Sequence, residues 1–149
     1  MVVRPRPGRV GVAIGGRTDR LTRGLGAPVV VAKEGGLVAG IGIALKSITG
    51  DSTQVIGVQS TMTSSMYRAF EAGEVVTTEI GKTLCDGLAG EVETTSFDRA
   101  RPVVDRMVLV DEEEVAPAIR ALYHRDGVVA EGAGAVGVAA MLSGDLKLD

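Results

Sequence analysis

The sequence is short of the side chains on which several common kinds of site depend. Among its 149 residues there is one cysteine, one histidine and no tryptophan, and aromatic residues make up 3%. A single cysteine, Cys85, excludes an internal disulfide and favours a reducing compartment, so we expect a cytoplasmic protein. A single histidine, His124, excludes a histidine metal cluster. The core is expected to be aliphatic.

The sequence also lacks long apolar runs, and its charge is not of one sign along the chain. The longest apolar run, Leu37–Leu45, is far shorter than the roughly 20 residues that a helix needs to cross a bilayer, and Val10–Gly16 is too short and glycine-rich for a signal peptide. We therefore expect no membrane contact. The net charge is −3, yet residues 1–32 hold six arginines and one acid. This basic start lacks aromatic residues and periodicity, so we expect no nucleic-acid binding.

Glycine, in contrast, is abundant. The 21 glycines are about twice the usual share of ~7%, which predicts backbones packed close together. The length predicts one domain. Residues 1–26 form an atypical arm rich in Arg, Gly and Pro with no sustained period, and residues 27–149 form an α/β domain. A second hypothesis is that residues 1–26 come from a frame-shifted or recombined reading frame.

From residue 27 onward, strand and helix patterns alternate. Alternation of this kind predicts an α/β fold with a mostly parallel sheet and flanking helices. The predicted strands are Pro28–Val31, Gln54–Gln59, Arg106–Val110 and Val128–Ala130. The predicted helices are Leu37–Lys46, Met66–Ala72 (ended by Gly73), Phe97–Asp105, the segment after a capping box of Asp111 and Glu114, and Gly132–Leu142 (ended by Gly144).

Two glycine motifs compete as candidate sites. Gly35 and Gly36 lie between an apolar strand and a helix, where backbone N–H groups can bind a phosphate. Gly132, Gly134 and Gly137 form a G-x-G-x-x-G pattern that is typical of dinucleotide binding. That pattern needs a second strand with an acid about 20 residues on, and the sequence does not supply it. We interpret the second motif as close helix packing and keep a nucleotide-binding α/β domain as an alternative.

Four stretches in order resemble one enzyme family. They are GGLVAGIGIALK (35–46), VIGVQSTMTSSMYRAFEAG (55–73), TLCDGLAG (83–90) and VLVDEEEVAPAIRALYHRDGVVAEGAGAVGVAAML (108–142). Together they resemble the C-terminal half of serine/threonine dehydratases, which are fold-type II pyridoxal-phosphate enzymes. The resemblance covers about residues 27–146. It implies part of the large domain of a tryptophan synthase β-like fold.

The resemblance also implies a cofactor and its binding positions. The family binds pyridoxal 5'-phosphate and removes water and ammonia from a hydroxy amino acid, giving a 2-oxo acid. A glycine-rich loop holds the phosphate, one glycine lies along the cofactor ring, and an acid lies near the pyridine end. The matching residues are Gly35, Gly36 and Leu37 for the loop, Gly87 for the ring and Glu131 for the pyridine end.

This sequence departs from the family pattern at several positions. Lys33 and Glu34 replace two loop glycines, and a carboxylate beside a phosphate is repulsive. Gln59 replaces a glutamate that helps many relatives to bind a structural cation, so we expect that metal site to be weak or absent. None of the four lysines (Lys33, Lys46, Lys82 and Lys147) has the Ser-Phe-Lys-x-Arg-Gly context of the family's Schiff-base lysine. We therefore assign no catalytic residue.

Three functions follow as hypotheses. The first is a truncated dehydratase that is inactive alone. The second is a non-catalytic module or split half that assembles with a lysine-bearing chain. The third is the unrelated nucleotide-binding domain. Because a partial sheet leaves strand edges and apolar faces uncovered, we also expect a homo-oligomer.

Overall fold

The computed structural model describes residues 11–13, 29–32, 35–144 and 146. Its centre is a four-stranded sheet, and every neighbouring pair of strands is parallel. The strands lie side by side in chain order: β1 (Gly11–Ala13), β2 (Val29–Ala32), β3 (Val55–Ser60) and β4 (Arg106–Val110). The predicted α/β fold with a mostly parallel sheet is confirmed.

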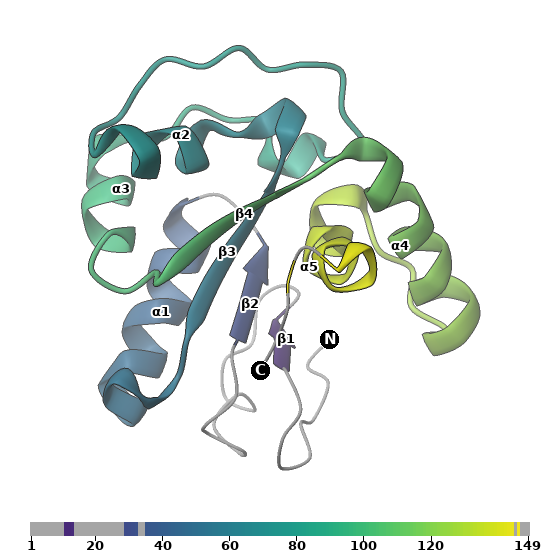
Figure 1. Ribbon diagram of the computed structural model, residues 1–149, viewed down its shortest axis with the longest axis horizontal. Coiled ribbons are helices and arrows are strands. Elements are labelled where there is room, and N and C mark those ends of the chain that lie inside the picture. The colour runs from purple at the N-terminus through teal and green to yellow at the C-terminus, as the bar shows by residue number, and fades with distance from the viewer. Residues whose placement is uncertain (1–10, 14–28, 33–34, 145, 147–149) are drawn as a thin grey trace.

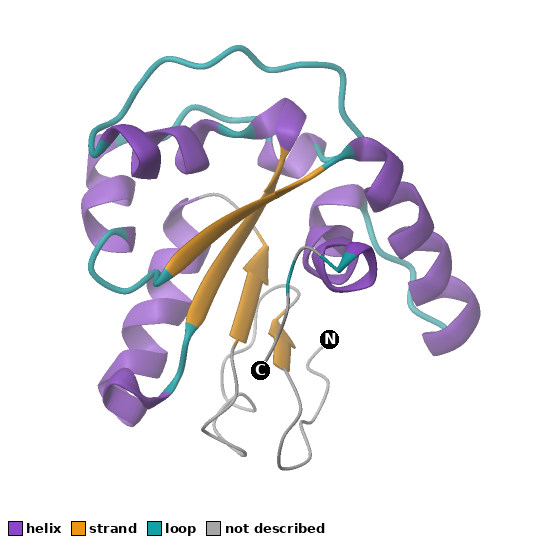
Figure 2. Cartoon of the chain, viewed as in Figure 1, coloured by secondary structure: helices purple, strands orange, loops and turns teal. Residues whose placement is uncertain are grey.

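Helices cover both faces of the sheet. α1 (Gly35–Thr49) and α3 (Thr94–Ala100) lie on one side, and α4 (Glu112–Asp126) and α5 (Gly132–Ser143) lie on the other (Figure 1). The remaining helices are α2 (Ser65–Ala72) and three single 3₁₀ turns, η1 (Gly50–Ser52), η2 (Thr61–Thr63) and η3 (Asp86–Leu88). The loop from α2 to η3 passes over the carboxyl end of the sheet (Figure 2).

The apolar core has two parts, one on each face of the sheet. Every residue of β3 is buried, as expected for a parallel strand covered on both faces. Ile56 and Val58 point toward α4 and α5, whereas Val55 points toward α1, α2 and α3. Only two aromatic side chains enter the cores, Phe70 and Phe97, which meet edge to face with ring centroids 5.5 Å apart. The expectation of an aliphatic core therefore holds in the described part of the chain.

Several predicted helix ends are confirmed. Gly73 and Gly144 end α2 and α5 in the left-handed conformation, with φ of 77° and 86°. The capping box at the start of α4 is present: the Asp111 side chain accepts from the backbone of Glu114, and the Glu114 carboxylate accepts from the Asp111 N–H at 2.7 Å. These local patterns fix helix ends because they satisfy backbone groups that have no partner within the helix.

Two predicted elements differ from the structure. Val128–Ala130 is a loop and not a strand, because the Val128 N–H donates to the Leu122 carbonyl and closes the C-terminus of α4 after Gly127. Val129 is 87% exposed. α3 ends at Ala100 instead of Asp105, because Asp105 pairs with Val55 at the start of β3.

The arm predicted for residues 1–26 is described only at β1, which pairs with β2. This short strand is not among the strands predicted from the sequence. In the described part of the chain, no helix is long and apolar enough to cross a membrane.

Candidate functional site

The candidate site residues gather at the carboxyl edge of the sheet. Ala32 is in register with Val58 and Ser60 with Val110, so β2, β3 and β4 end at the same edge. The start of α1 follows β2, and the start of α4 follows β4. In open α/β sheets, ligands bind at this edge.

The start of α1 is open. Gly35 is the first residue of α1, Gly36 is exposed, and a Cβ atom placed on Gly36 would meet no atom of the described residues within 4 Å apart from the adjoining backbone. Leu37 is half-buried and packs against the core beneath α1. The first backbone N–H groups of a helix have no partner inside it and favour an anion. Lys33 and Glu34 lie outside the described residues, so their effect on phosphate binding stays a prediction.

Gly87 and Glu131 are brought together at the start of α5. A Cβ atom on Gly87 would lie 3.1 Å from the Ala133 Cβ and 3.5 Å from Oε1 of Glu131. Glu131 is the N-cap residue of α5, and its side chain is exposed. Two of the five predicted site residues, far apart in sequence, thus lie side by side on the α5 side of the sheet.

The backbone before Gly87 also lies against α5. A Cβ atom on Gly132 would lie 2.0 Å from the Leu84 carbonyl oxygen and 3.1 Å from the Cys85 nitrogen. No side chain can occupy that space, so Gly132 is required by close backbone packing. The interpretation of the second glycine motif as a packing feature is consistent with this contact.

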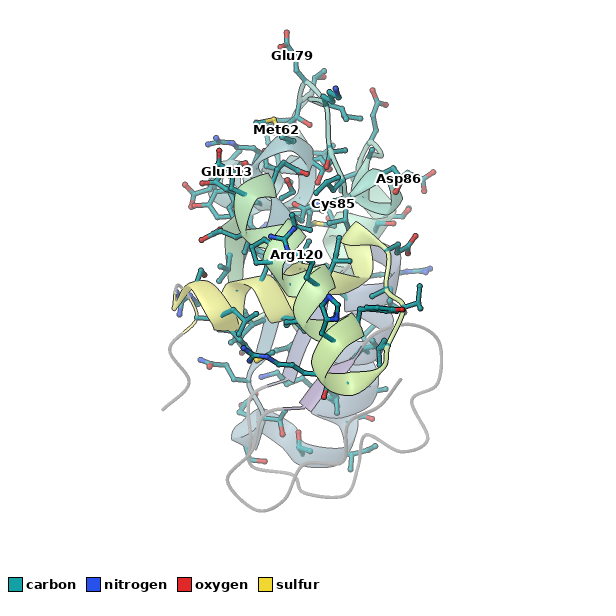
Figure 3. The ribbon with its side chains drawn as sticks, turned by 90° about the vertical axis from the view of Figure 1, so that its right-hand side faces the viewer. Met62, Glu79, Cys85, Asp86, Glu113 and Arg120 are labelled. Atoms are coloured by element: carbon teal, nitrogen blue, oxygen red, sulfur yellow. The ribbon has the colours of Figure 1, made fainter. Side chains whose placement is uncertain are left out.

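Glu112 binds the same loop from the opposite side. Its Oε1 accepts hydrogen bonds from the Ser60 hydroxyl and from the Thr83 hydroxyl, the latter at 2.7 Å. Its Oε2 accepts from the Leu84 N–H at 2.6 Å. In the view of Figure 3, Cys85 lies between Glu113 at the start of α4 and Asp86 on η3. One carboxylate therefore links β3, α4 and the loop that carries Gly87.

These contacts shift two pKa values. Burial acts to raise the pKa of Glu112, but the hydrogen bonds from Ser60, the Leu84 backbone and Thr83 together lower it below the usual glutamate value. Burial, and next the charge of Glu112, raises the pKa of the Cys85 thiol to about 11. Cys85 is fully buried, so it is a protonated core residue and not a nucleophile.

Comparison with known proteins identifies the family. The family model described as "Pyridoxal-phosphate dependent enzyme" matches residues 17–149. This chain belongs to the family of pyridoxal-phosphate dependent enzymes. It is 43% identical over 113 residues to the catabolic L-threonine dehydratase TdcB of Escherichia coli K12, covering 75% of this chain and 34% of that protein. It is also 43% identical over 122 residues to the L-threonine ammonia-lyase of Thermotoga maritima, covering 81% of this chain and 29% of that protein.

Solved structures agree with this assignment. The T.th. threonine deaminase superposes with a TM-score of 0.74 at 30% identity, over 97% of this chain and 46% of that one. Maize serine racemase superposes with a TM-score of 0.76 at 26% identity, over 84% of this chain and 38% of that one. The chain spans about a third of the length of the curated relatives it matches. The predicted family resemblance and fold type are confirmed.

The described residues fit the phosphate of the pyridoxal phosphate that this enzyme family binds, because the first turn of α1 is open at Gly36. At Gly87 a Cβ atom would be crowded by Ala133 and Glu131, so this glycine lets its loop lie close against α5. The family's chemistry also requires a lysine that binds the cofactor, and the structure describes two of the chain's lysines. Lys46 donates to Asp105 at 2.9 Å, and it lies ten residues along α1 from Gly36, about 15 Å away. Lys82 is exposed in the loop before Thr83; Lys33 and Lys147 lie outside the described residues.

Gln59 stands where many family members have a glutamate that helps to bind a cation, and it offers an amide group instead of a carboxylate. It is 1% exposed, and its Oε1 accepts from the Tyr67 N–H at 2.8 Å at the start of α2. Its Nε2 is buried with no partner among the described residues. An amide N–H₂ repels a cation, and the amide oxygen is already in use. These donors do not suit a cation, and the predicted weak or absent metal site stays a prediction.

Sequence reasoning missed Glu112, Thr83 and Ser60. The predicted capping box accounts for Asp111 and Glu114 in the acidic run 111–114. One signal was present: the capping box uses two of the four acids, so two are left over. Sequence alone does not distinguish Glu112, which contacts two other segments, from Glu113, which is exposed.

Proposed function

We propose that this chain forms the phosphate and ring side of a threonine dehydratase-type site, and that it is inactive without a lysine from another polypeptide segment. The reaction would remove water and ammonia from a hydroxy amino acid such as threonine, giving a 2-oxo acid. The proposal extends to this chain what the names of its relatives say of those proteins. Because the chain spans about a third of their length, the complete activity requires further residues.

The observation that carries the proposal is the meeting of Gly87 and Glu131 at the sheet edge where α1 begins. In this arrangement the N–H groups of Gly36 and Leu37 bind the phosphate. Gly87 lets its loop lie close against α5 beside Glu131, and Glu131 offers an acceptor at the ring's edge. Pyridoxal phosphate supplies an electron sink for loss of a proton and then of the β-hydroxyl group.

The proposed inactivity of the chain alone is supported by the positions of the two lysines that the structure describes. Lys46 is held by Asp105 near the C-terminus of α1, away from the carboxyl edge of the sheet. Lys82 follows Gly81 and has no serine or phenylalanine before it, unlike the family's cofactor-binding lysine. Neither residue is placed to carry the cofactor and to act as base.

The test is reconstitution. The purified chain is mixed with a separately expressed segment of E. coli TdcB that this chain does not match and that carries the cofactor lysine, together with pyridoxal phosphate and L-threonine. Release of the 2-oxo acid is followed by a coupled NADH assay. We expect no product from either piece alone and product from the mixture. A Gly36→Asp variant should abolish the gain, whereas Gly40→Asp, one turn further along α1 and equally open, should retain it.

Two results would contradict the proposal. Turnover by the chain alone, with a lysine labelled after borohydride treatment and found by peptide mass spectrometry, would refute inactivity. A mixture that forms a complex by size-exclusion chromatography yet neither binds pyridoxal phosphate nor releases product would refute the dehydratase function. Tight binding of NAD by the chain would instead favour the nucleotide-binding alternative.

A further inference from the structure

We propose that Glu112 and Thr83 form a clasp that fixes the loop of residues 83–90 against α5, which makes Glu112 a positioning residue for Gly87. The effect of the clasp on cofactor binding rests on the function proposed above. The clasp itself is a property of this chain and can be tested without cofactor or partner.

The clasp joins three segments that are distant in sequence. The carboxylate of Glu112 accepts a hydrogen bond from the hydroxyl of Ser60 at the end of β3. It also accepts from the Thr83 hydroxyl and from the Leu84 backbone N–H, both in the loop. Hydrogen bonds to a charged group are about twice as strong as neutral ones. Because these bonds reach across 28 and 52 positions of the chain, they hold tertiary structure and not helix α4 itself.

Thr83 extends the clasp into the loop. Its hydroxyl donates to Glu112 and accepts from the Cys85 N–H at 2.8 Å. The next residue, Leu84, is held on two sides. Its N–H donates to Glu112, and its carbonyl packs against the backbone of Gly132. A shift of this peptide therefore changes the distance between Gly87, three residues further on, and Glu131.

Few other contacts hold the loop at this end; just before it, the Gly81 N–H donates to the Met62 carbonyl at 3.0 Å. Between α2 and α3 the chain forms a single 3₁₀ turn and no strand. Its apolar anchors are Cys85 and Leu88, both fully buried, and its other polar anchor is the Ser65 hydroxyl on the Gly90 carbonyl at 3.1 Å. The clasp and this bond lie at opposite ends of residues 83–90. Loss of the clasp should therefore free residues 83–86 first.

The neighbouring acids separate the clasp from a general charge effect. Asp111 and Glu114 are used by the capping box, and Asp111 also accepts from the Thr61 hydroxyl at 2.9 Å. Glu113 is exposed and has no hydrogen bond or ion pair with any residue that the structure describes. Glu113→Gln is therefore a matched control, since it removes the same charge from the next residue.

Cys85 reports on the clasp directly. It is the only cysteine in the sequence and is fully buried, so a thiol reagent reacts only when the loop or the whole protein opens. The experiment measures the rate of reaction with a neutral disulfide reagent at several urea concentrations below the unfolding transition. A weak dependence on urea indicates local opening, and the full dependence of unfolding indicates global opening.

The decisive variant is Thr83→Val, which removes both hydroxyl bonds but leaves the charge of Glu112 in place. This matters because the charge of Glu112 raises the pKa of Cys85, whereas the Thr83 hydroxyl lowers it. Loss of the hydroxyl therefore does not speed the reaction through the pKa of the thiol, as loss of the charge would. We expect Thr83→Val to react at least about tenfold faster, from the cost of a lost hydrogen bond to a charged group, with a weak urea dependence. Thr83→Ser should restore the slow rate, and Glu113→Gln should react like the parent chain.

Two results would overturn the clasp: an unchanged rate in Thr83→Val, or an increase with the urea dependence of global unfolding. The reconstituted mixture tests positioning. Thr83→Val should weaken pyridoxal phosphate binding about tenfold, with Thr83→Ser restoring it. An unchanged affinity despite fast thiol labelling would overturn the positioning role. If the parent mixture is itself inactive, the proposed function fails, while the labelling rates still decide whether the clasp exists.

Discussion

Two glycines at the same edge of the sheet have opposite surroundings. Gly36, at the start of α1, is exposed, and a Cβ atom there would lie more than 4 Å from every atom in the described part of the chain apart from the adjoining backbone. Gly132, at the start of α5, is buried, and a Cβ atom there would lie 2.0 Å from a backbone oxygen. Packing among the described residues requires a glycine at position 132 but not at position 36. The open position 36 leaves room for a ligand such as a phosphate, whereas the closed position 132 does not.

The comparison extends to the two sides of the candidate site. On the α5 side, the loop carrying Gly87 is fixed by close backbone contact with Gly132 and by the carboxylate of Glu112. On the α1 side, the first turn presents backbone N–H groups with open space above Gly36. In the proposed site, the close-packed loop lies along the ring and the open helix end holds the phosphate.

The largest effect on stability is expected from Gly132→Ala. The added methyl group would overlap the Leu84 carbonyl, and the backbone would have to move because no flexible side chain can give way. We expect a loss of about 3 kcal/mol in the free energy of unfolding, at the upper end for overpacking, measured by urea denaturation. Gly40→Ala is the control, and it should gain about 0.5 to 1 kcal/mol from helix propensity. Equal effects of the two variants would remove the contrast between packed and open glycines.

The second largest effect on stability is expected from acid, which should lower the free energy of unfolding through Glu112 on the α5 side. Because hydrogen bonds lower the pKa of Glu112 in the folded protein, the folded state binds its proton less tightly than the unfolded state does. The stabilisation is therefore complete above the usual glutamate pKa of about 4.3 and is lost as the pH falls through the lower folded value. We expect the parent to lose about 1 kcal/mol more than Glu112→Gln over this range, after discounting for partial exposure.

The acid effect is measured by urea unfolding at pH 6, 5, 4 and 3. Glu113→Gln should follow the pH dependence of the parent, since Glu113 is exposed without a partner among the described residues. Parallel curves for the parent and Glu112→Gln would show that the carboxylate contributes nothing specific to the fold.

The α4–α5 side and the α1 side should also differ in whether they take part in self-association. Near the end of α4, Tyr123 is 58% and Val129 is 87% exposed, whereas on α1 Ile48 is 57% exposed. We expect a homo-oligomer through the α4–α5 side, so that light scattering gives a mass above the 15.3 kDa of one chain. Val129→Glu should lower this mass and Ile48→Glu should not. A monodisperse mass of one chain for the parent would contradict the expectation.

The sequence was sufficient for features that depend on local chemistry. The strand before Gly35, the capping box of Asp111 and Glu114 and the glycine helix ends at Gly73 and Gly144 were predicted correctly, because each is set by neighbouring residues. The family motifs also predicted Gly87 and Glu131 as site positions, and the structure brings them together. Their roles in binding still require the experiments above.

Features that depend on distant contacts were not predicted. Val128–Ala130 has strand-forming residues, yet it closes the end of α4 because the Val128 N–H finds its partner there. Glu112 and Glu113 are identical side by side in sequence and differ only in what lies opposite them. The need for Gly132 likewise comes from Leu84, a residue distant in the chain, and no period or propensity records such a contact.

The smallest effect on stability, and the sharpest test of the open glycine, is expected from Gly36→Asp. A carboxylate in the first turn of a helix is favourable, so the free energy of unfolding should rise by about 0.5 kcal/mol. The same charge would repel a phosphate bound at that turn, so the affinity of the reconstituted mixture for pyridoxal phosphate should fall at least about tenfold. Gly40→Asp, also open but one turn further on, should leave the affinity within about twofold. Equal affinities for the two variants would show that Gly36 does not face the phosphate, because only its position separates them.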